Sequence, residues 1–145
     1  MIKVKLLTKT AKLPTKAHES DAGFDIYASE GIVIQPMSRG LVHTGIAIEI
    51  PKLQESNKDL YVRIAPRSGL SATYGIDIFA GVVDRGYTGE IIVCVFNSSK
   101  ERFVVKKGDK IAQMIPTVIY KDNIVEASKL GESKRGKKGF GSTDK

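Results

Sequence analysis

The last eleven residues of the chain, RGKKGFGSTDK from Arg135 to Lys145, have the composition of a phosphate-binding segment. Three glycines let the backbone approach an anion closely and turn its N–H groups toward it. Ser142 and Thr143 add hydroxyl donors, and the Arg135 guanidinium can bind two phosphate oxygens at once. Phe140 adds a flat ring, and because a chain end is held on one side only, the segment is expected to close over a ligand bound elsewhere. Taken alone, a Gly- and Lys-rich end is more often a flexible basic tail.

A second candidate phosphate site is the segment 65–70, APRSGL, which follows an apolar strand predicted over 61–64. The proline stiffens the exit from the strand, and Ser68 and Gly69 leave backbone amides unpaired where a short helix is predicted over 69–74. Arg67 adds a guanidinium beside these amides. By itself, an Arg-Ser-Gly sequence is more often only a helix cap.

The segment 81–90, GVVDRGYTGE, has an acid and an aromatic ring three residues apart in a glycine-rich turn. Asp84, at the end of a strand, could orient and deprotonate a water molecule, and Tyr87 could present its ring face to a sugar. The alternative is a turn aspartate that hydrogen-bonds its own backbone.

Two further segments each have one polar group beside apolar residues. Asp25 offers a carboxylate after a turn, and Gln113 is the one polar residue of 111–115. Asp109, in the turn before Gln113, is expected only to order its loop. Neither segment defines a site by itself.

Short β-strands must position these residues, because apolar runs alternate with turn residues at a spacing of roughly ten residues. Strands are predicted over 4–7, 31–34, 45–50, 61–64, 91–96, 103–105 and 111–120, and a polar loop over 51–59. No long amphipathic helix is found. The sequence therefore predicts an all-β fold, a distorted jelly roll or β-barrel of short antiparallel strands with at most one short helix.

The net charge of +7 lies at the two ends of the chain. Residues 1–17 have five lysines and no acid, residues 129–145 have six basic and two acidic residues, and residues 18–128 have a net charge of −2. This distribution suits attraction of a polyphosphate better than a groove for duplex DNA, so no nucleic-acid partner is expected.

A chain of 145 residues is long enough for one domain with a substantial core. Cys94, the only cysteine, lies in an apolar run and is expected to be a buried strand residue, which excludes a disulfide framework. No apolar stretch has the length of a membrane span, and the N-terminus lacks a secretory apolar region. We therefore expect no membrane partner and a soluble, intracellular protein, cytoplasmic or, in a eukaryotic or viral setting, nuclear.

Five segments occur in an order typical of one enzyme family and cover nearly the whole chain. They are 22–29, 63–70, 81–90, 108–115 and 135–143, the last containing GFGST. On these segments the chain resembles the trimeric-type deoxyuridine triphosphate nucleotidohydrolases, or dUTPases. The resemblance implies conversion of dUTP and water to dUMP and pyrophosphate with Mg²⁺, which lowers dUTP and supplies dUMP for thymidylate synthesis.

The resemblance also implies a role for each segment. Asp84 would be the catalytic general base, Asp25 would bind Mg²⁺ through water, and Tyr87 would exclude a 2′-hydroxyl. Uracil would enter a hairpin over 78–83, where Phe140 would stack on it. The substrate-binding residues implied in this way are Arg67, Ser68, Gly69, Ile78, Gly81, Val82, Val83, Tyr87, Ile92, Gln113, Arg135, Phe140, Gly141, Ser142 and Thr143.

In the family, three copies share their active sites in a homotrimer. Residues 1–130 would form the β-barrel domain, and residues 131–145 a flexible C-terminal lid that covers a site built by other subunits. Two alternatives stay open: a dCTP deaminase of the same superfamily, and a catalytically silent β-domain that binds a protein partner. The APRSG sequence and Phe140 favour the dUTPase over the deaminase.

The chain departs from the family pattern near the expected site. Phe79 stands where the hairpin usually has a small residue, and Arg85 and Gly86 replace a more acidic pair. Val62 replaces a common glycine, and Asp144 replaces the usual glycine after Ser-Thr. None of the residues implied in catalysis is lost.

Overall fold

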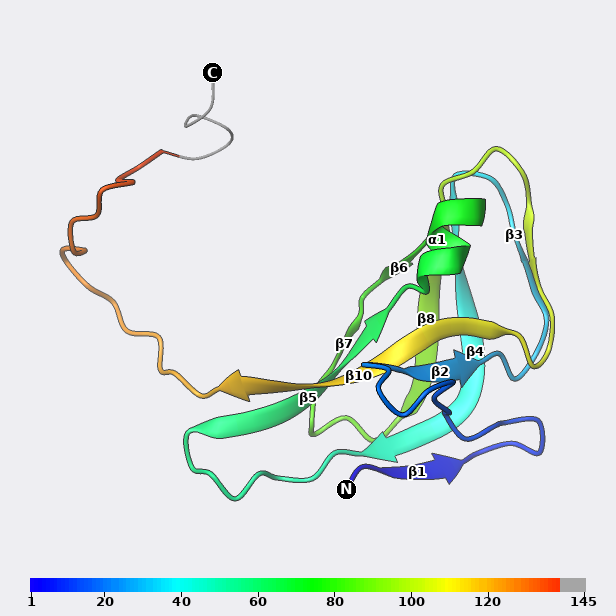
Figure 1. Ribbon diagram of the computed structural model, residues 1–145, viewed down its shortest axis with the longest axis horizontal. Coiled ribbons are helices and arrows are strands. Elements are labelled where there is room, and N and C mark those ends of the chain that lie inside the picture. The colour runs from blue at the N-terminus through cyan, green and yellow to red at the C-terminus, as the bar shows by residue number, and fades with distance from the viewer. Residues whose placement is uncertain (139–145) are drawn as a thin grey trace.

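The computed structural model describes residues 1–138, which form ten β-strands and one α-helix (Figure 1). In chain order they are β1 (Lys3–Leu6), β2 (Phe24–Tyr27), β3 (Ile32–Ile34), β4 (Ser38–Glu49), β5 (Lys58–Ala65), α1 (Ser68–Tyr74), β6 (Ile76–Phe79), β7 (Val82–Val83), β8 (Glu90–Asn97), β9 (Phe103–Val105) and β10 (Lys110–Tyr120). No helix in this part of the chain has the length and apolar character needed to cross a membrane.

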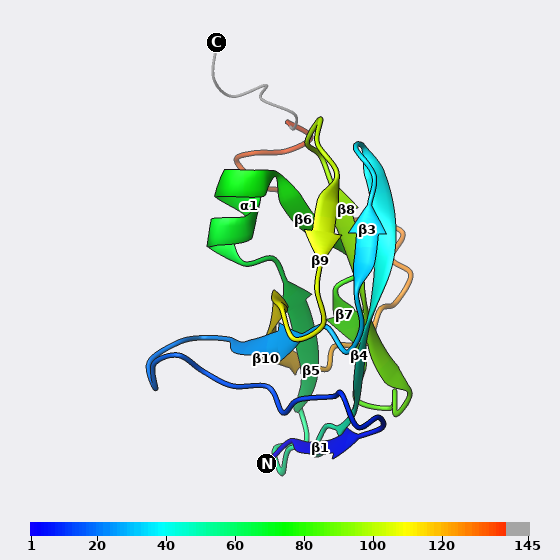
Figure 2. The same ribbon diagram turned by 90° about the vertical axis from the view of Figure 1, so that its right-hand side faces the viewer.

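The strands form two four-stranded sheets and one small sheet. The first sheet has the order β1-β4-β8-β6, the second has the order β2-β10-β5-β7, and β3 pairs with β9. All neighbouring strands are antiparallel, and they come from distant parts of the chain, as Figure 2 shows for β3 and β9. Over residues 1–138 the strands do not close into a barrel. The predicted all-β class with one short helix is confirmed.

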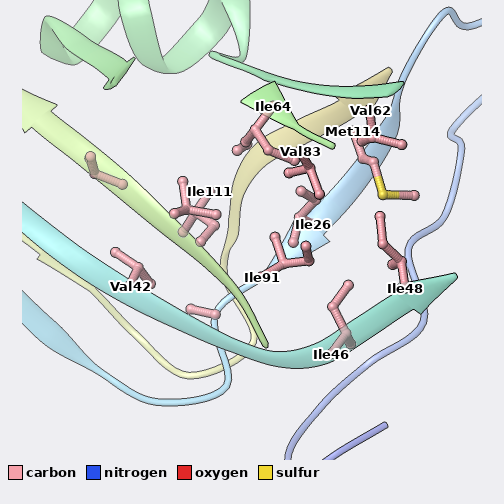
Figure 3. Packing of buried hydrophobic residues seen from close by; sticks show 14 of the residues in the cluster. Ile26, Val42, Ile46, Ile48, Val62, Ile64, Val83, Ile91, Ile111 and Met114 are labelled. Carbon is pink, nitrogen blue, oxygen red and sulfur yellow. The ribbon is translucent and has the colours of Figure 1, made fainter. Parts of the chain in front are cut away.

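The hydrophobic core lies between the two larger sheets. Successive side chains of a strand point to opposite faces, and β8 accordingly buries Ile91, Val93 and Val95 while the residues between them are less buried. In Figure 3, Ile46 of β4 and Ile26 of β2 extend into the same interior as Ile91. Burying an isoleucine side chain contributes about 1.5–3 kcal/mol. This packing holds both sheets in fixed positions.

Several strands differ from the sequence prediction. β4 begins at Ser38, seven residues before the predicted strand, because Gly40 and Val42 point inward while Arg39 and Leu41 point outward. The glycine is needed there, because a Cβ at position 40 would lie 2.7 Å from Cγ1 of Ile34. The sequence of this part of β4 shows no alternation of apolar and polar residues, because Gly40 and polar side chains occupy several of its positions.

One strand that the sequence did not indicate, β2, was predicted only as a turn followed by a carboxylate. β6 and β7 lie where a hairpin was predicted over 78–83, and β6 begins two residues earlier. The predicted polar loop 51–59 is also shorter, because Lys58 and Asp59 already belong to β5. Asp59 is therefore a strand residue with a defined orientation.

The predicted helix is present as α1, one residue longer at its start. Gly75 ends it in the left-handed conformation with a φ of 65°, and its N–H points to the carbonyl groups of Leu70 and Ser71. None of the helical residues is fully buried. After β10, residues 121–138 are all exposed and lead away from the sheets as an arm (Figure 1).

Candidate active site

A pocket of about 190 Å³ lies where the connection between β6 and β7 meets β8 and β5. The acid and the ring of the predicted turn, Asp84 and Tyr87, both line this pocket. Its other lining residues are Ile64, Ile78, Phe79, Ala80, Val82, Val83, Ile91, Ile92, Val93 and Cys94. The lining is thus mostly apolar, with one carboxylate and one phenol.

The segment 78–83 crosses from one sheet to the other. β6 pairs with β8 whereas β7 pairs with β5, so the two arms of the expected hairpin belong to different sheets. Ala80 has a φ of 52°, and the N–H of Ile64 donates to the carbonyl oxygen of Gly81 at 2.8 Å. A Cβ at position 81 would collide with the Ile64 carbonyl oxygen, so only glycine permits this approach. The crossing therefore fixes the backbone of this segment beside the pocket.

A tight turn sets the positions of Asp84 and Tyr87. The Tyr87 N–H donates to the carbonyl oxygen of Asp84 at 3.0 Å, and the Tyr87 hydroxyl donates to the carbonyl oxygen of Glu90 at 2.9 Å. A Cβ on Gly89 would lie 2.6 Å from that hydroxyl, so a glycine makes room for it. Between residues 1 and 138 the Asp84 carboxylate has no hydrogen-bond partner, unlike Asp109, which accepts the Lys106 N–H at 2.8 Å. An aspartate that only closes its own turn was the alternative predicted for Asp84, and it is Asp109 that has this geometry.

Asp25 and Gln113 are neighbours in the second sheet and form, together with Arg67 and Lys110, a group that we call the cationic row. Asp25, Gln113 and Ala65 are register partners on β2, β10 and β5. The Gln113 amide donates to the carbonyl oxygen of Pro66 at 2.9 Å. Ala65 directly follows the pocket residue Ile64 in β5, and successive side chains of a strand point to opposite faces.

Asp25 joins two cations in this row. Its Oδ1 lies 3.0 Å from Nε of Arg67, and its Oδ2 lies 2.7 Å from Nζ of Lys110. The Arg67 guanidinium also donates to the carbonyl oxygen of Lys110 at 3.2 Å. The hydrogen bond and the charge of Asp25 raise the pKa of Lys110. Two cations facing one carboxylate leave a net positive charge, which suits a polyanionic ligand.

The start of α1 is open beside this row. Ser68 and Gly69 are its first residues, and the preceding Arg67 makes no side-chain capping hydrogen bond. The N–H groups of a first helical turn have no acceptor within the helix. A Cβ on Gly69 would meet no atom within 4 Å, so nothing nearby covers the backbone at this position.

The donor set fits a metal ion that is bound indirectly. In the part of the chain that the structure describes, no three or more His, Cys, Asp or Glu side chains are grouped to hold a metal. Asp25 offers one carboxylate beside the cations of the row. Mg²⁺ keeps several of its waters and is often bound by one or two carboxylates together with substrate phosphates. A single carboxylate in this position is compatible with that mode of binding.

His43 and Glu90 connect β4 to the start of β8, directly after the turn of Tyr87. Nδ1 of His43 lies 3.0 Å from Glu90 Oε2, and the Gly45 N–H donates to Oε1 at 2.8 Å. The hydrogen bond to Glu90 raises the pKa of His43, although partial burial opposes it, and the charges of Glu90 and Glu30 add to the increase. Burial alone would raise the pKa of Glu90, but the hydrogen bonds from His43 and Gly45 lower it.

The structure brings most of the predicted site residues into two groups. The pocket group contains Ile78, Val82, Val83, Asp84, Tyr87 and Ile92, and Gly81 belongs to the crossing segment beside it. The charged group contains Asp25, Arg67 and Gln113, with Ser68 and Gly69 next to Arg67. Arg135 is not brought to either group, because it is exposed on the arm and donates to the Lys138 carbonyl oxygen at 3.0 Å. The remaining predicted residues, Phe140, Gly141, Ser142 and Thr143, lie outside the described residues.

Sequence reasoning missed several residues of the site. Cys94 is a residue of β8, but it is only partly buried and lines the pocket, so the prediction that it is a buried residue was wrong. Apolar strand residues such as Ile64 carry no signal that separates pocket lining from core. The cation of Lys110 could have been noted at the start of a strand three residues before Gln113.

Comparisons with known proteins agree with one another. The family model described as dUTPase matches residues 9–144. The chain is 45% identical over 146 residues to a deoxyuridine 5′-triphosphate nucleotidohydrolase of Clostridium tetani, with 99% of this chain and 97% of that protein covered. It is 47% identical over 144 residues to the Saccharomyces cerevisiae protein of the same name, covering 99% of this chain and 94% of that protein. A solved structure of a mutant dUTPase from Staphylococcus bacteriophage 80alpha with dUpNHpp gives a TM-score of 0.83 at 28% identity, covering 99% of this chain and 98% of that one.

Fold, site and comparisons together define the class, an all-β hydrolase of nucleotide metabolism. Within that class, the chain belongs to the dUTPase family. This membership confirms the resemblance drawn from the five ordered segments, and with it an enzyme of the dUTP diphosphatase type.

Proposed function

We propose that the protein hydrolyses dUTP to dUMP and pyrophosphate at the pocket lined by Asp84 and Tyr87. The observation that carries the proposal is the presence of two groups in a member of the dUTPase family: an apolar pocket with one carboxylate that is unpaired within residues 1–138, and a cationic row in the second sheet. The pocket suits a base and a sugar, and the row suits a triphosphate. In a homotrimer with shared sites, the two groups that bind one substrate need not belong to the same copy.

Asp84 is the general base in this proposal. Its carboxylate lines the pocket and has no hydrogen-bond partner within residues 1–138, so it is available to accept a proton from water. The water oxygen forms a new bond to phosphorus, and the bond between dUMP and the departing pyrophosphate breaks. The turn that joins Asp84 to Tyr87 supports this role, because it sets the carboxylate in relation to the sugar.

Arg67, Ser68, Gly69 and Gln113 bind the phosphates, and Asp25 binds Mg²⁺ through water. Support comes from the proximity of Asp25 and Arg67, 3.0 Å apart, because a guanidinium that bound a phosphate there would bring that phosphate and its metal ion near the carboxylate. When bound, Mg²⁺ neutralises charge on the triphosphate. The guanidinium and the open amides at the start of α1 stabilise the charge that develops on the phosphates.

Specificity for deoxyuridine arises from the crossing segment and from Tyr87. The backbone of 78–83, held against Ile64 by Gly81, presents fixed donors and acceptors to uracil, and a base with the opposite pattern leaves them unpaired. Tyr87 lies under the deoxyribose and leaves no space for a 2′-hydroxyl. Its hydrogen bond to the Glu90 carbonyl supports this role because it fixes the ring.

The active enzyme is a homotrimer in which residues 131–145 form a lid over a site built by other subunits, and residues 1–130 form the β-domain. Exposed apolar residues support association: Leu41 and Phe79 on the first sheet, and Ile124, Val125 and Leu130 on the arm. In the lid, Phe140 stacks on uracil, Arg135, Ser142 and Thr143 reach the γ-phosphate, and Gly141 admits a close backbone approach.

Pyrophosphate release from dUTP, UTP, dCTP and dTTP, each with and without Mg²⁺, tests the proposal. We expect release from dUTP with Mg²⁺ and little from the other three. Tyr87→Ala should raise the rate with UTP relative to dUTP, whereas Tyr74→Ala, which removes an exposed tyrosine of α1, should leave the ratio unchanged. Ammonia release from dCTP would favour the deaminase, and no reaction with any nucleotide would favour a silent binding domain.

A further inference from the structure

A carboxylate outside the pocket, Asp59 on β5, binds two cations from different parts of the chain. Its Oδ1 lies 2.9 Å from Nε of Arg85, and its Oδ2 lies 3.1 Å from Nζ of Lys121. The N–H of Leu60 also donates to Oδ1, at 2.9 Å. The Asp59 side chain is only 13% exposed, so its oxygens are bound mainly by the protein itself.

The order of the strands explains how one residue reaches both cations. β5 lies between β10 and β7 in the second sheet. On one side, Asp59 pairs with Ile119, two residues before Lys121. On the other side, β7 leads directly into Asp84 and Arg85. Asp59 is therefore a central strand residue contacted from both neighbours.

Arg85 belongs to the loop that carries the candidate base and the candidate sugar-binding ring. It follows Asp84 and precedes Tyr87, and all residues from 84 to 89 are exposed, so packing against the core does not hold this loop. Within the described chain, the ion pair with Asp59 is the only salt bridge that the loop makes. Arg85 itself does not line the pocket.

Lys121 is the residue at which the arm leaves the sheets. Its N–H donates to the carbonyl oxygen of Asn57 at 2.9 Å. From residue 122 to residue 138 every residue is exposed, and the hydrogen bonds found there, between residues 133 and 138, are local. Within the described residues, the contacts of Lys121 with Asn57 and Asp59 are thus the last hydrogen bond and ion pair that the chain makes with the sheets.

The contacts of Asp59 lower its pKa below the ordinary value of 3.8. The Leu60 N–H lowers the pKa of Asp59, and the contacts with Lys121 and Arg85 lower it further despite partial burial, to about 2. The ion pairs therefore persist over the whole range between mildly acidic and basic pH. A neutral amide at this position would keep the shape and lose the attraction to both cations.

We propose that Asp59 is a positioning residue of this enzyme, which holds the loop of Asp84 through Arg85 and the base of the C-terminal arm through Lys121. This inference rests on the proposed function, because it assumes that Asp84 is the base. Asp59 does not touch the pocket, so it acts on the reaction only through the placement of other groups. A misplacement of about 1 Å at a reacting centre can cost about a hundredfold in rate.

Asp59→Asn tests the proposal, with Glu55→Gln as the matched control. Glu55 precedes β5 and pairs with Lys58, the first residue of that strand, at 2.6 Å. The control therefore removes the same charge near the same end of β5 without touching the loop or the arm. In Asp59→Asn we expect kcat for dUTP to fall by about tenfold or more, consistent with a misplaced base. Glu55→Gln should keep the wild-type kcat.

A double variant separates an effect through Arg85 from a general loss of order. If Asp59 acts through Arg85, the double variant Asp59→Asn/Arg85→Leu should lose no more kcat than the more affected of the two single variants. The effects of two coupled residues are not additive. Losses that multiply would overturn this part of the inference. Should Asp59→Asn not fold, Arg85→Leu breaks the same contact from its more exposed partner and decides the question.

Hydrogen exchange supplies a readout that does not depend on activity. The amides of Tyr87 and Lys121 are both hydrogen-bonded, and both should exchange faster in Asp59→Asn than in Glu55→Gln. Wild-type kcat together with unchanged exchange at these two amides would overturn the proposal. If the wild-type protein releases no pyrophosphate, the proposed function fails, while exchange at Tyr87 and Lys121 still decides whether Asp59 holds the loop and the arm.

Discussion

Three aspartates of this chain differ in role because their surroundings differ. Asp109 accepts a backbone N–H and closes a turn, and Asp59 is bound by two cations and a backbone N–H. Asp84 follows a strand like a turn residue, yet its carboxylate has no such partner within residues 1–138 and lines the pocket. The residue type is the same in each case, so the neighbouring groups distinguish the candidate base Asp84 from the other two.

Asp84→Asn should lower kcat for dUTP by about 10²- to 10⁴-fold, the usual contribution of a general base. Binding of dUpNHpp should change little, because asparagine has the same shape and Asp84 forms no ion pair in the described chain. Pyrophosphate release and calorimetry measure the two quantities. Asp109→Asn is the control, and we expect it to lower the melting temperature while kcat is retained, since Asp109 only closes a turn. Substantial turnover by Asp84→Asn would exclude it as the base.

Among the secondary-structure elements, β4 and β8 are held together at the beginning of β8 by side chains as well as by their ladder. The register shifts between His43 and Ala47, where backbone pairing is interrupted. Glu90 fills this gap by accepting the Gly45 N–H and contacting His43, and the Thr44 hydroxyl donates to the Ile91 carbonyl oxygen. Because the Tyr87 hydroxyl bonds the carbonyl oxygen of Glu90, the irregular part of β4 also supports the turn at the pocket.

The contact between His43 and Glu90 should make stability depend on pH. A raised pKa of His43 stabilises the fold fully below the ordinary value of 6.5, and this contribution is lost as pH rises through the raised pKa. A lowered pKa of Glu90 stabilises the fold fully above the ordinary value of 4.5, and this contribution is lost as pH falls through the lowered pKa. Both contributions are complete between pH 4.5 and 6.5.

His43→Val should therefore reduce the melting temperature most between these two pH values and progressively less as the pH rises above 6.5. Thermal unfolding from about pH 4 to about pH 9, a range that includes the ordinary pKa values of both groups, measures the difference in melting temperature between His43→Val and wild type. His18→Val is the control, because the side chain of His18 makes no hydrogen bond in residues 1–138. A difference from wild type that is constant across pH would show that His43 acts only through packing.

On the scale of the whole molecule, the sheets and the arm have different relations to the core. The strands bury a continuous cluster of aliphatic side chains, whereas residues 121–138 bury nothing. The exposed Ile124, Val125 and Leu130 gain no burial from their own subunit. This contrast supports the proposal that the arm serves a site on another copy of the chain.

A chain ending at residue 130 should keep the melting temperature of the β-domain and lose dUTP hydrolysis by about a hundredfold, the scale expected when a closing segment no longer positions the substrate. A chain ending at residue 138 retains Arg135 but lacks Phe140 and the residues after it, so it should lose activity as well, and the difference between the two chains measures what residues 131–138 contribute. Calorimetric unfolding and pyrophosphate release give the two readouts. Full activity of the shorter chain would contradict the role of 131–145 as a lid.

The sequence predicted those strands that are continuous apolar runs better than those that alternate apolar with polar or glycine residues. Continuous apolar runs such as 91–96 gave β8 nearly to its ends, because their burial follows from composition. β2 and the first half of β4 were missed, because their alternation includes Asp25, Gly40 and other residues whose burial depends on a partner strand. Strand order could not be predicted at all, since the pairing of β10 with both β2 and β5 is a long-range choice.

The sequence by itself determined the family, the candidate base, the candidate phosphate ligands and the all-β class, because these depend on residue types in five ordered segments. Only the tertiary structure decided which of them meet. It joined Asp25 to Arg67 and Lys110, made Cys94 a pocket residue, and gave Asp59 two cations from opposite neighbours of β5. The physical reason is that a motif is local, whereas an ion pair or a pocket wall requires two distant segments to be brought together by packing between sheets.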